Sequence, residues 1–333
     1  MMRTIFRTMY EYLSRSEELV LVTVIAASGA TPRGAGARML VGREGRICGT
    51  IGGGAVEYRA IQIAGTVLRE QASVRRDFCL NQNDVQDLGM ICGGAVDVFF
   101  HYLPAADPAA MALANVAERH FAAGHDLWFI TDVCSGSSMG LYTAEEGFFG
   151  IDVPACLPLT RHPERVGDLF VEQIHSRGKV YVFGGGHVAQ ELVPVLSHVG
   201  FRCVVVEDRE EFAKKELFPT AEEIILCDMY RIGDYMTITE EDYVCVMTRG
   251  HAHDTVVQAQ ILRCHPCYCG VIGSIHKAAS VRKVLKEVHG LTDAELDLIT
   301  TPIGLPIKGE TPAEIAISIC AQMILHRAER SRR

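Results

Sequence analysis

An apolar strand, a glycine-rich turn and a helix are predicted to follow one another in "VYVFGGGHVAQEL". Gly184, Gly186 and Ala189 have the spacing of the small residues in a dinucleotide-binding turn, which accepts alanine at its third position. An acidic pair, Glu207 and Asp208, ends the next apolar stretch about 20 residues on, where a ribose-binding carboxylate belongs. Because strand, turn, helix and acid occur together, this segment predicts a Rossmann-like domain.

The rest of the chain after this turn alternates between apolar strands and helices. Further strands are expected at 223–227, 243–248 and 268–274, with helices between them. Such alternation is typical of a parallel sheet covered by helices on both faces. We therefore predict an α/β protein. An N-terminal mixed α/β domain, residues 1–177, is followed by a Rossmann-like, doubly wound parallel-sheet domain, residues 178–333.

The first domain is expected to begin with a helix and a strand near residues 19–27, followed by a glycine-rich loop and a hairpin. Three glycines then begin a long helix. Another helix is predicted from Pro108 to Gly124, since proline favours the first helical turn and glycine favours the helix end. The stretch 135–178 is rich in turn residues, so we expect an edge hairpin and then a linker near 155–177.

The glycine turn of the second domain is a candidate site for a phosphate-bearing ligand. Gly184, Gly185 and Gly186 precede a helix whose first N–H groups can bind an anion. His187 lies in the same turn and is a candidate contact to a phosphate or a pterin, and Asp208 is the candidate carboxylate for a ribose. The alternative is that the glycines only let the helix pack closely against the strand.

Three loops of the first domain share this glycine-rich composition. "SGATPRGAGARM" places Arg33 and Arg38 among glycines, "GTIGGGAVE" contains a glycine triplet, and "MICGGAV" places Cys92 before two glycines. Glycine lets backbone N–H groups approach a ligand, and arginine supplies fixed donors for an anion. Tight turns in a compact sheet are the alternative for each loop. The candidate cofactor-binding residues of these loops are Arg33, Gly52, Gly53, Gly54, Glu57 and Gly93.

The motif "TRGHAHD" follows the predicted strand at 243–248. It therefore lies at the carboxyl end of a strand, where open α/β sheets bind their ligands. His251, His253 and Asp254 are candidate site residues, although a helix N-terminus with an aspartate in its first turn explains them equally well. We expect this edge to face the first-domain loop that carries Arg33, because two anion-favouring surfaces suit one ligand.

Composition narrows the classes of function. The formal net charge is −9 and the sequence pI is about 5.8, which disfavours a nucleic-acid surface. The apolar run "LVLVTVIAA" is shorter than the ~20 residues that cross a bilayer, and the N-terminus lacks the features of a signal peptide. We therefore expect a cytoplasmic protein without a membrane segment, in which most of the 12 cysteines are reduced thiols.

The stretch "RCHPCYCG" raises the question of a metal site. Cys264 and Cys267 have the spacing of metal ligands, but a structural zinc site usually takes two such pairs, and the sequence has no second one. Cys269 falls in a predicted strand, where a small apolar residue is expected. We therefore predict core cysteines here and no metal site.

A series of motifs gives the chain a family resemblance. The first domain contains "SGATPRGAGARMLV", "GTIGGGAVE" and "CGGAVDV", and the second contains "VYVFGGGHVAQEL", "TRGHAHD", "GVIGSIHK" and "TPIGLPIKGETPAEIAISICAQM". With these motifs in this order, the chain resembles the XdhC/CoxI family, the accessory proteins that mature molybdenum hydroxylases such as xanthine dehydrogenase.

The resemblance implies a maturation factor, or chaperone, rather than a turnover enzyme. Such a protein binds the molybdenum cofactor, as molybdopterin or its dinucleotide form, and assists its sulfuration and insertion. The implied partners are an apo molybdenum hydroxylase of the xanthine dehydrogenase or aldehyde oxidoreductase type and a cysteine desulfurase, and a homodimer is left open. Cys92 would supply a soft thiolate near the molybdenum or its sulfur; a small buried residue is the alternative. The rival function is an NAD(P)-dependent oxidoreductase that uses the second domain.

Overall fold

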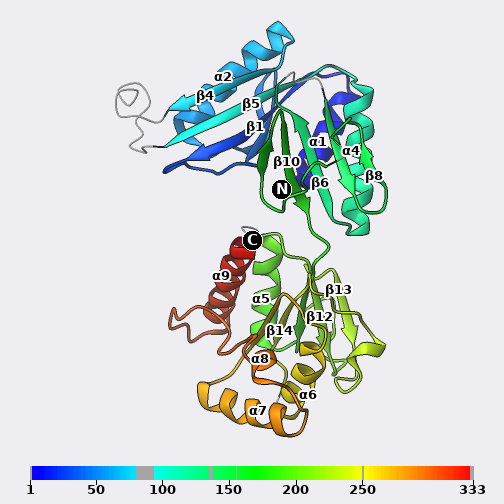
Figure 1. The fold of residues 1–333 in the computed structure, drawn as a ribbon, viewed down its shortest axis with the longest axis vertical. Coiled ribbons are helices and arrows are strands. Elements are labelled where there is room, and N and C mark those ends of the chain that lie inside the picture. The colour runs from blue at the N-terminus through cyan, green and yellow to red at the C-terminus, as the bar shows by residue number, and fades with distance from the viewer. Residues whose placement is uncertain (1, 80–93, 135–137, 155, 250, 331–333) are drawn as a thin grey trace. The chain divides into compact units, whose positions relative to one another are not determined.

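The computed structural model describes residues 2–79, 94–134, 138–154, 156–249 and 251–330. The chain divides into two compact units, Met1–Arg177 and Gly178–Arg333 (Figure 1). Antiparallel sheets and helices make up the first unit, and a parallel sheet between helices makes up the second. The predicted fold class is therefore confirmed.

The first sheet of the first unit is covered by helices on both faces (Figure 1). Its strands are antiparallel in the order β3-β2-β1-β5-β4. Side chains alternate along β1, so that Val20 and Val22 pack with α2, whereas Leu19 and Leu21 pack with α1 and α4. The elements are α1 (Met2–Ser14), β1 (Leu19–Ser28), β2 (Arg38–Gly42), β3 (Gly45–Thr50), α2 (Gly54–Glu70), β4 (Val74–Cys79), β5 (Ala95–Leu103) and α4 (Pro108–Ala123).

A second antiparallel sheet, in the order β8-β7-β6-β10-β9, completes the first unit. Its strands are β6 (Leu127–Asp132), β7 (Met139–Thr143), β8 (Gly147–Phe149), β9 (Glu164–Val166) and β10 (Leu169–His175). The stretch 155–177, expected as a linker, thus supplies two strands. Phe170 and Val171 of β10 are fully buried, and β10 pairs along its length with β6. This burial explains why the stretch is part of the sheet.

A buried ion pair connects the two sheets. Arg38 of β2 is fully buried and pairs with Glu172 of β10. Its guanidinium carbon also lies 5.0 Å from the ring centroid of Phe129 and 5.7 Å from that of Phe170. Burial lowers the pKa of Arg38 to about 9. Arg38 is therefore a structural residue of the sheets, not an exposed arginine of the glycine-rich loop.

The second unit has one six-stranded sheet in the order β13-β12-β11-β14-β15-β16, with every neighbouring pair parallel. Helices α5 and α9 pack on one face, and α6, α7 and α8 pack on the other. The strand order reverses between β11 and β14, and ligands of such sheets bind at the carboxyl ends of the strands at this point. The elements are β11 (Val180–Phe183), α5 (His187–His198), β12 (Cys203–Glu207), β13 (Glu223–Leu226), η1 (Ile232–Asp234), β14 (Tyr243–Val246), α6 (His251–Leu262), β15 (Tyr268–Val271), α7 (Ile275–Glu287), α8 (Asp293–Leu296), β16 (Ile299–Thr300) and α9 (Pro312–Arg330).

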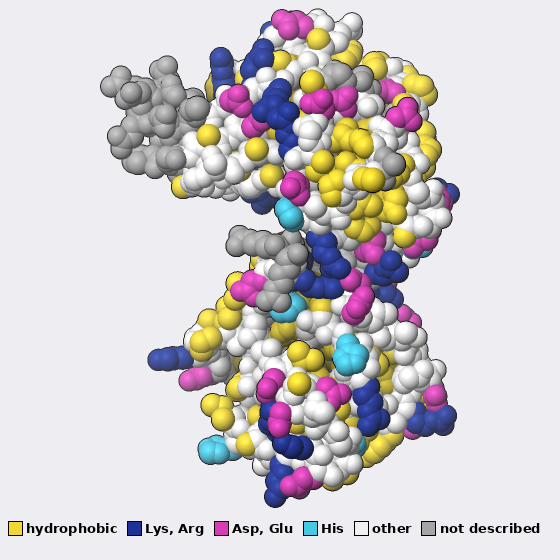
Figure 2. All heavy atoms as spheres, in the orientation of Figure 1, with side chains coloured by type: hydrophobic (Ala, Val, Ile, Leu, Met, Phe, Trp, Pro, Cys, Tyr) yellow, Lys and Arg dark blue, Asp and Glu magenta, His cyan; other side chains and the backbone are white. Residues whose placement is uncertain are grey.

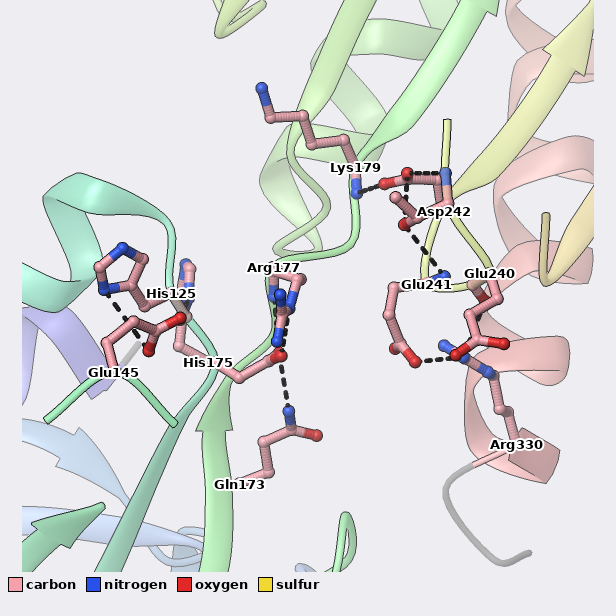
Figure 3. A network of polar contacts seen from close by, with 12 residues as sticks. His125, Glu145, Gln173, His175, Arg177, Lys179, Glu240, Glu241, Asp242 and Arg330 are labelled. Carbon is pink, nitrogen blue, oxygen red and sulfur yellow. Dashed lines mark hydrogen bonds and ion pairs between the residues drawn. The ribbon is translucent and has the colours of Figure 1, made fainter. Parts of the chain in front are cut away.

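At the amino ends of the parallel strands, acidic side chains already accept hydrogen bonds from other parts of the chain (Figure 3). Asp242, just before β14, accepts from the backbone N–H groups of Lys179 and Thr239, each at 2.8 Å. Arg330 of α9 pairs with the neighbouring Glu241 at 3.0 Å. The carboxyl edge is therefore the better candidate for a ligand.

The surface carries charges of both signs. On the face drawn in Figure 2, Lys and Arg side chains are interspersed with Asp and Glu side chains over both units. Hydrophobic side chains also gather on the visible face of the first unit. Within the described ranges, none of the helices is long and apolar enough to cross a membrane.

Candidate functional site

Two glycine loops of the first unit lie against the loop that follows β1. A Cβ atom added at Gly52 would lie 2.6 Å from Pro32 Cβ and 3.3 Å from Arg33 Cγ. A Cβ atom at Gly94 would lie 2.4 Å from the carbonyl oxygen of Ala30. Loop 28–37 therefore contacts both, and the structure brings together Arg33 and the glycine triplet that begins α2.

Gly94 is the first described residue after the segment that contains two of the candidates. Cys92 and Gly93 lie outside the described residues, and their predicted roles stay predictions.

Glu57 holds the glycine triplet in place from inside the protein. Its Oε2 atom accepts from Thr50 Oγ1 at 2.5 Å and from the N–H groups of Ile51 and Gly53 at 3.1 Å each. Arg46 pairs with Oε1 at 3.0 Å. Burial opposes ionisation, but these hydrogen bonds and the charge of Arg46 outweigh it and lower the pKa of Glu57. The observed contacts of Glu57 are thus internal ones, and they occupy the N–H group of Gly53.

The side of this turn away from Glu57 is open. A Cβ atom added at Gly53 would meet no atom within 4 Å, and Arg33 is exposed. Gly53 and Gly54 have φ values of 73° and 60°, which favour glycine over other residues. A ligand can therefore approach the backbone at Gly53, beside the arginine.

The glycine turn of the second unit lies at the point where the strand order reverses. Gly184 has φ of 104°, and a Cβ atom there would lie 2.4 Å from the carbonyl oxygen of Met247, at the end of β14. The N–H group of Gly185 donates to Glu207 Oε2 at 2.6 Å. By contrast, a Cβ atom at Gly186 would meet nothing within 4 Å, and His187 is exposed at the first position of α5. The open part of the turn is therefore Gly186 and His187.

Glu207 and Asp208, adjacent in sequence, have different environments. Glu207 is only 1% exposed and accepts from Arg209 Nε at 3.0 Å. Burial opposes its ionisation, but the hydrogen bonds from Arg209, Asp208 and Gly185 and the charge of Arg209 prevail and lower the pKa of Glu207 to about 2. Hydrogen bonding with Glu207, burial and the charge of Glu207 raise the pKa of Asp208, whose side chain is 31% exposed. Asp208 is the carboxylate that a ligand can reach.

Asp208 lies at the rim of a surface hollow of about 460 Å³, here called the Asp208 hollow. Sequence reasoning identified Asp208 and His253, whose Oδ2 and Nδ1 atoms are 3.5 Å apart, but missed the aromatic residues beside them. The sequence feature that pointed to Tyr230 was its position soon after a predicted strand, in "EIILCDMY". The lining residues are Asp208, Leu226, Cys227, Asp228, Met229, Tyr230, Tyr235 and His253.

Asp254 is fully buried at the start of α6. Its two oxygens are 2.5 Å from Thr248 Oγ1 and 2.5 Å from Lys277 Nζ. The ion pair joins α6 to α7 and borders a cavity of about 360 Å³ lined by both helices, β15 and β16. Lys277 was missed as the partner of Asp254, although it lies in the quoted motif "GVIGSIHK". The side chain of His251 lies outside the described part of the structure.

The cysteine-rich stretch contributes to the core of the second unit. Cys269 of β15 is 2% exposed, and burial raises its pKa to about 12; burial also raises the pKa of Cys267 to about 11. Cys264 is exposed. In the part of the chain that the structure describes, no group of three or more His, Cys, Asp or Glu side chains is arranged to hold a metal ion.

Comparison with known proteins agrees with both units. A model described as the XdhC Rossmann domain matches residues 180–323, and one described as the XdhC and CoxI family matches residues 12–78. The chain therefore belongs to the XdhC/CoxI family, as the motifs predicted.

Three similar proteins extend this result. A probable xanthine dehydrogenase subunit of Bacillus subtilis (strain 168) is 26% identical over 335 residues, which cover 96% of each protein. "Molybdenum cofactor insertion chaperone PaoD" of Escherichia coli (strain K12) is 34% identical over 119 residues, or 35% of this chain and 36% of PaoD. A crystal structure of a protein named xanthine dehydrogenase from Bacillus halodurans has a TM-score of 0.78, with 24% identity over 98% of this chain and 96% of that chain. The last similarity supports the fold.

Proposed function

We propose that this protein is a maturation factor for a molybdenum hydroxylase of the xanthine dehydrogenase or aldehyde oxidoreductase type. The observation that carries the proposal is family membership together with 34% identity to a molybdenum cofactor insertion chaperone. The cargo is the molybdenum cofactor, as molybdopterin or its dinucleotide form. The protein acts in the cytoplasm, receives sulfur from a cysteine desulfurase and delivers the sulfurated cofactor to the apo hydroxylase.

The open glycine positions suit such a cargo. Gly53 and Gly186 each have free space where a side chain would be, and each lies beside an exposed side chain, Arg33 or His187. Backbone N–H groups at a helix start favour an anion, and an arginine can donate several hydrogen bonds to a phosphate. Because the N–H group of Gly53 already donates to Glu57, the proposed first-unit contact to the anionic parts of the cofactor is Arg33, with Gly53 leaving space for the ligand. Gly186 and His187 are the proposed second-unit contacts.

Gly186→Val tests the second-unit contact. The branched side chain has room and the φ of −70° suits any residue, so the fold should remain intact while phosphate access is blocked. The full chain is co-expressed with the cofactor pathway, purified, and assayed for molybdenum by mass spectrometry and for pterin by fluorescence after oxidation. Gly186→Val should retain less of both, and Gly65→Val on α2 should match the wild type. A wild type that retains no pterin and does not activate an apo hydroxylase would refute the proposal.

Cys92 is proposed as the thiol that meets the molybdenum or its sulfur. A thiolate is a soft ligand, and Gly93, which follows Cys92 in the sequence, has no side chain that could cover it. Cys92→Ala should unfold at the wild-type temperature but fail to activate the apo hydroxylase. Cys156→Ala, which changes an exposed cysteine, is the matched control. Early unfolding with full activation would instead indicate a packing role.

An NAD(P)-dependent oxidoreductase is the second candidate, favoured by the strand order β13-β12-β11-β14-β15-β16. Calorimetric titration of the purified protein with NAD and NADP tests it. Micromolar binding with hydride transfer to an aldehyde would replace the chaperone proposal.

A further inference from the structure

The cavity beside Asp254 has apolar walls that come from the second unit. It is called the Asp254 cavity here, and its volume is about 360 Å³. Its buried lining residues include Val271 of β15, Val281 and Leu285 of α7 and Leu296 of α8. Packed interiors contain few voids larger than a water molecule, and pockets for small ligands begin at about 300 Å³. The cavity therefore has the size and the walls of a site for a small organic molecule.

The cations that line the cavity are already paired with carboxylates. Lys277 Nζ lies 2.5 Å from Asp254. Arg282 pairs with Asp297 at 2.8 Å and with Asp293 at 3.3 Å. Because the side chain of Asp297 is 70% exposed whereas Asp254 is fully buried, the Arg282 pair marks the open end of the cavity. An anion would have to displace a carboxylate from one of these cations, and breaking a buried pair is costly, so the cavity favours a neutral ligand over a phosphate.

Gln258 brings an unused hydrogen-bond acceptor to the buried end of the cavity. It lies one helical turn after Asp254 on α6, lines the cavity and is 2% exposed. Its Nε2 atom donates to the backbone carbonyl of Asp254 at 2.9 Å. Among the residues that the structure describes, none donates a hydrogen bond to its Oε1 atom. A buried amide oxygen without a donor costs free energy, and an N–H group of a ligand in the cavity would satisfy it.

Lys277 supplies donors at the same end of the cavity. An ammonium group has three N–H donors, and Asp254 needs only one of them. Both Lys277 and Gln258 bind Asp254, the first through its carboxylate and the second through its backbone carbonyl. A ligand at this end can therefore donate to Gln258 and accept from Lys277. The edge of a cyclic amide, where a ring N–H group adjoins a C=O group, has this pattern, and the apolar walls suit the rest of the ring.

We propose that the Asp254 cavity binds a neutral, planar heterocycle that contains a cyclic amide. Gln258 Oε1 accepts from the ring N–H group, Lys277 Nζ donates to the ring carbonyl, and Val281 and Leu285 contact the body of the ring. The ligand is a free ring without a phosphate, because the cations of the cavity are held by carboxylates. This site goes beyond the maturation function, since it requires neither the molybdenum cofactor nor a hydroxylase.

Calorimetric titration of the full-length protein with quinazolin-4-one, hypoxanthine and 2-pyridone tests the site. At least one of these cyclic amides should bind. Its derivative with a methyl group on the amide nitrogen should bind about 10-fold more weakly, since Gln258 then lacks its donor. The proposal is overturned if none of the three binds, which would indicate a cavity that holds only water. It is also overturned if the methylated form binds as tightly as the parent ring.

Two variants locate the bound ring. Gln258→Leu keeps a side chain of similar size and should weaken the parent ring about 10-fold, with little change for the methylated form. Val281→Phe should fill the cavity and prevent binding of both forms. Gln62→Leu, at an exposed glutamine of α2, should match the wild type. Wild-type affinity in both Gln258→Leu and Val281→Phe would place the ring elsewhere and overturn the proposal. If Gln258→Leu does not fold, the methylated probes still test the same hydrogen bond in the wild-type chain.

Discussion

Replacing Glu207 by glutamine should destabilise the second unit in a pH-dependent way. The folded pKa of Glu207 is about 2, against an ordinary value of 4.5. Because the folded value is the lower one, the carboxylate stabilises the fold above the ordinary pKa, and this contribution is lost as the pH falls toward the folded value. Linkage gives a contribution of about 3 kcal/mol at pH 7 and about 1 kcal/mol at pH 3. Glu207→Gln should reduce the free energy of unfolding by about these amounts.

The assay must report on each unit separately, since a chain with two units need not unfold in one step. Hydrogen exchange measured by mass spectrometry on peptides that span 180–190 reports on the glycine turn. Trp128, the single tryptophan, lies in β6 and reports on the first unit by fluorescence. In urea, Glu207→Gln should increase hydrogen exchange over 180–190 in the second unit. The urea concentration at the midpoint of the Trp128 fluorescence transition should stay unchanged.

Glu57→Gln provides the matched control. Glu57 holds a glycine turn of the first unit in the same manner, and its pKa is also lowered, so the Trp128 transition should shift while exchange over 180–190 stays unchanged. The reasoning fails if the Glu207→Gln difference is as large at pH 3 as at pH 7. It also fails if the difference at pH 7 is below about 0.5 kcal/mol, the range of neutral surface substitutions.

Three further substitutions test other buried contacts. Arg38→Met leaves Glu172 charged and buried without its partner and should reduce the unfolding free energy by about 3–5 kcal/mol, measured by tryptophan fluorescence in urea. Gly94→Ala should cost about 1–3 kcal/mol, because its Cβ would lie 2.4 Å from a carbonyl oxygen in the loop after β1; Gly34→Ala, with nothing within 4 Å, should change the melting temperature little. Lys277→Met should cost about 3–5 kcal/mol, because its carboxylate partner stays fully buried, and hydrogen exchange in α6 should increase.

The parallel sheet could be predicted from the sequence because its strands are buried on both faces. Such strands are short continuous apolar runs, as in "VYVF", and the glycine turn with the acids after the next strand indicated a Rossmann-like domain. The second sheet of the first unit could not be predicted in the same way. Residues Glu164–Val166 and Gly147–Phe149 form strands of three residues each, too short to show an alternation.

Candidate residues at the sheet edge could be chosen from the sequence, but the different environments of the two carboxylates could not be predicted from it. Glu207 and Asp208 are adjacent, and only the folded structure distinguishes the buried one from the accessible one. The sequence predicts Glu57 as a ligand contact, whereas its donors Thr50 and Arg46 approach it only when β3 and α2 come together. Tyr230 was missed because exposure of an aromatic ring cannot be read from its position after a strand.

The Gly185–Glu207 hydrogen bond has a consequence for ligand selection. Glu207 is tethered to the turn, so it is an internal competitor for the Gly185 N–H group, present in every molecule at a high effective concentration. A small anion that used this N–H group would have to displace Glu207 first. The apparent dissociation constant of such an anion would be its intrinsic value divided by the fraction of molecules in which Glu207 has left the Gly185 N–H group. Because that fraction is small, the anion would bind weakly. Abundant inorganic anions are thereby disfavoured at this position, whereas a larger ligand with contacts elsewhere along the sheet edge can bind without breaking the bond.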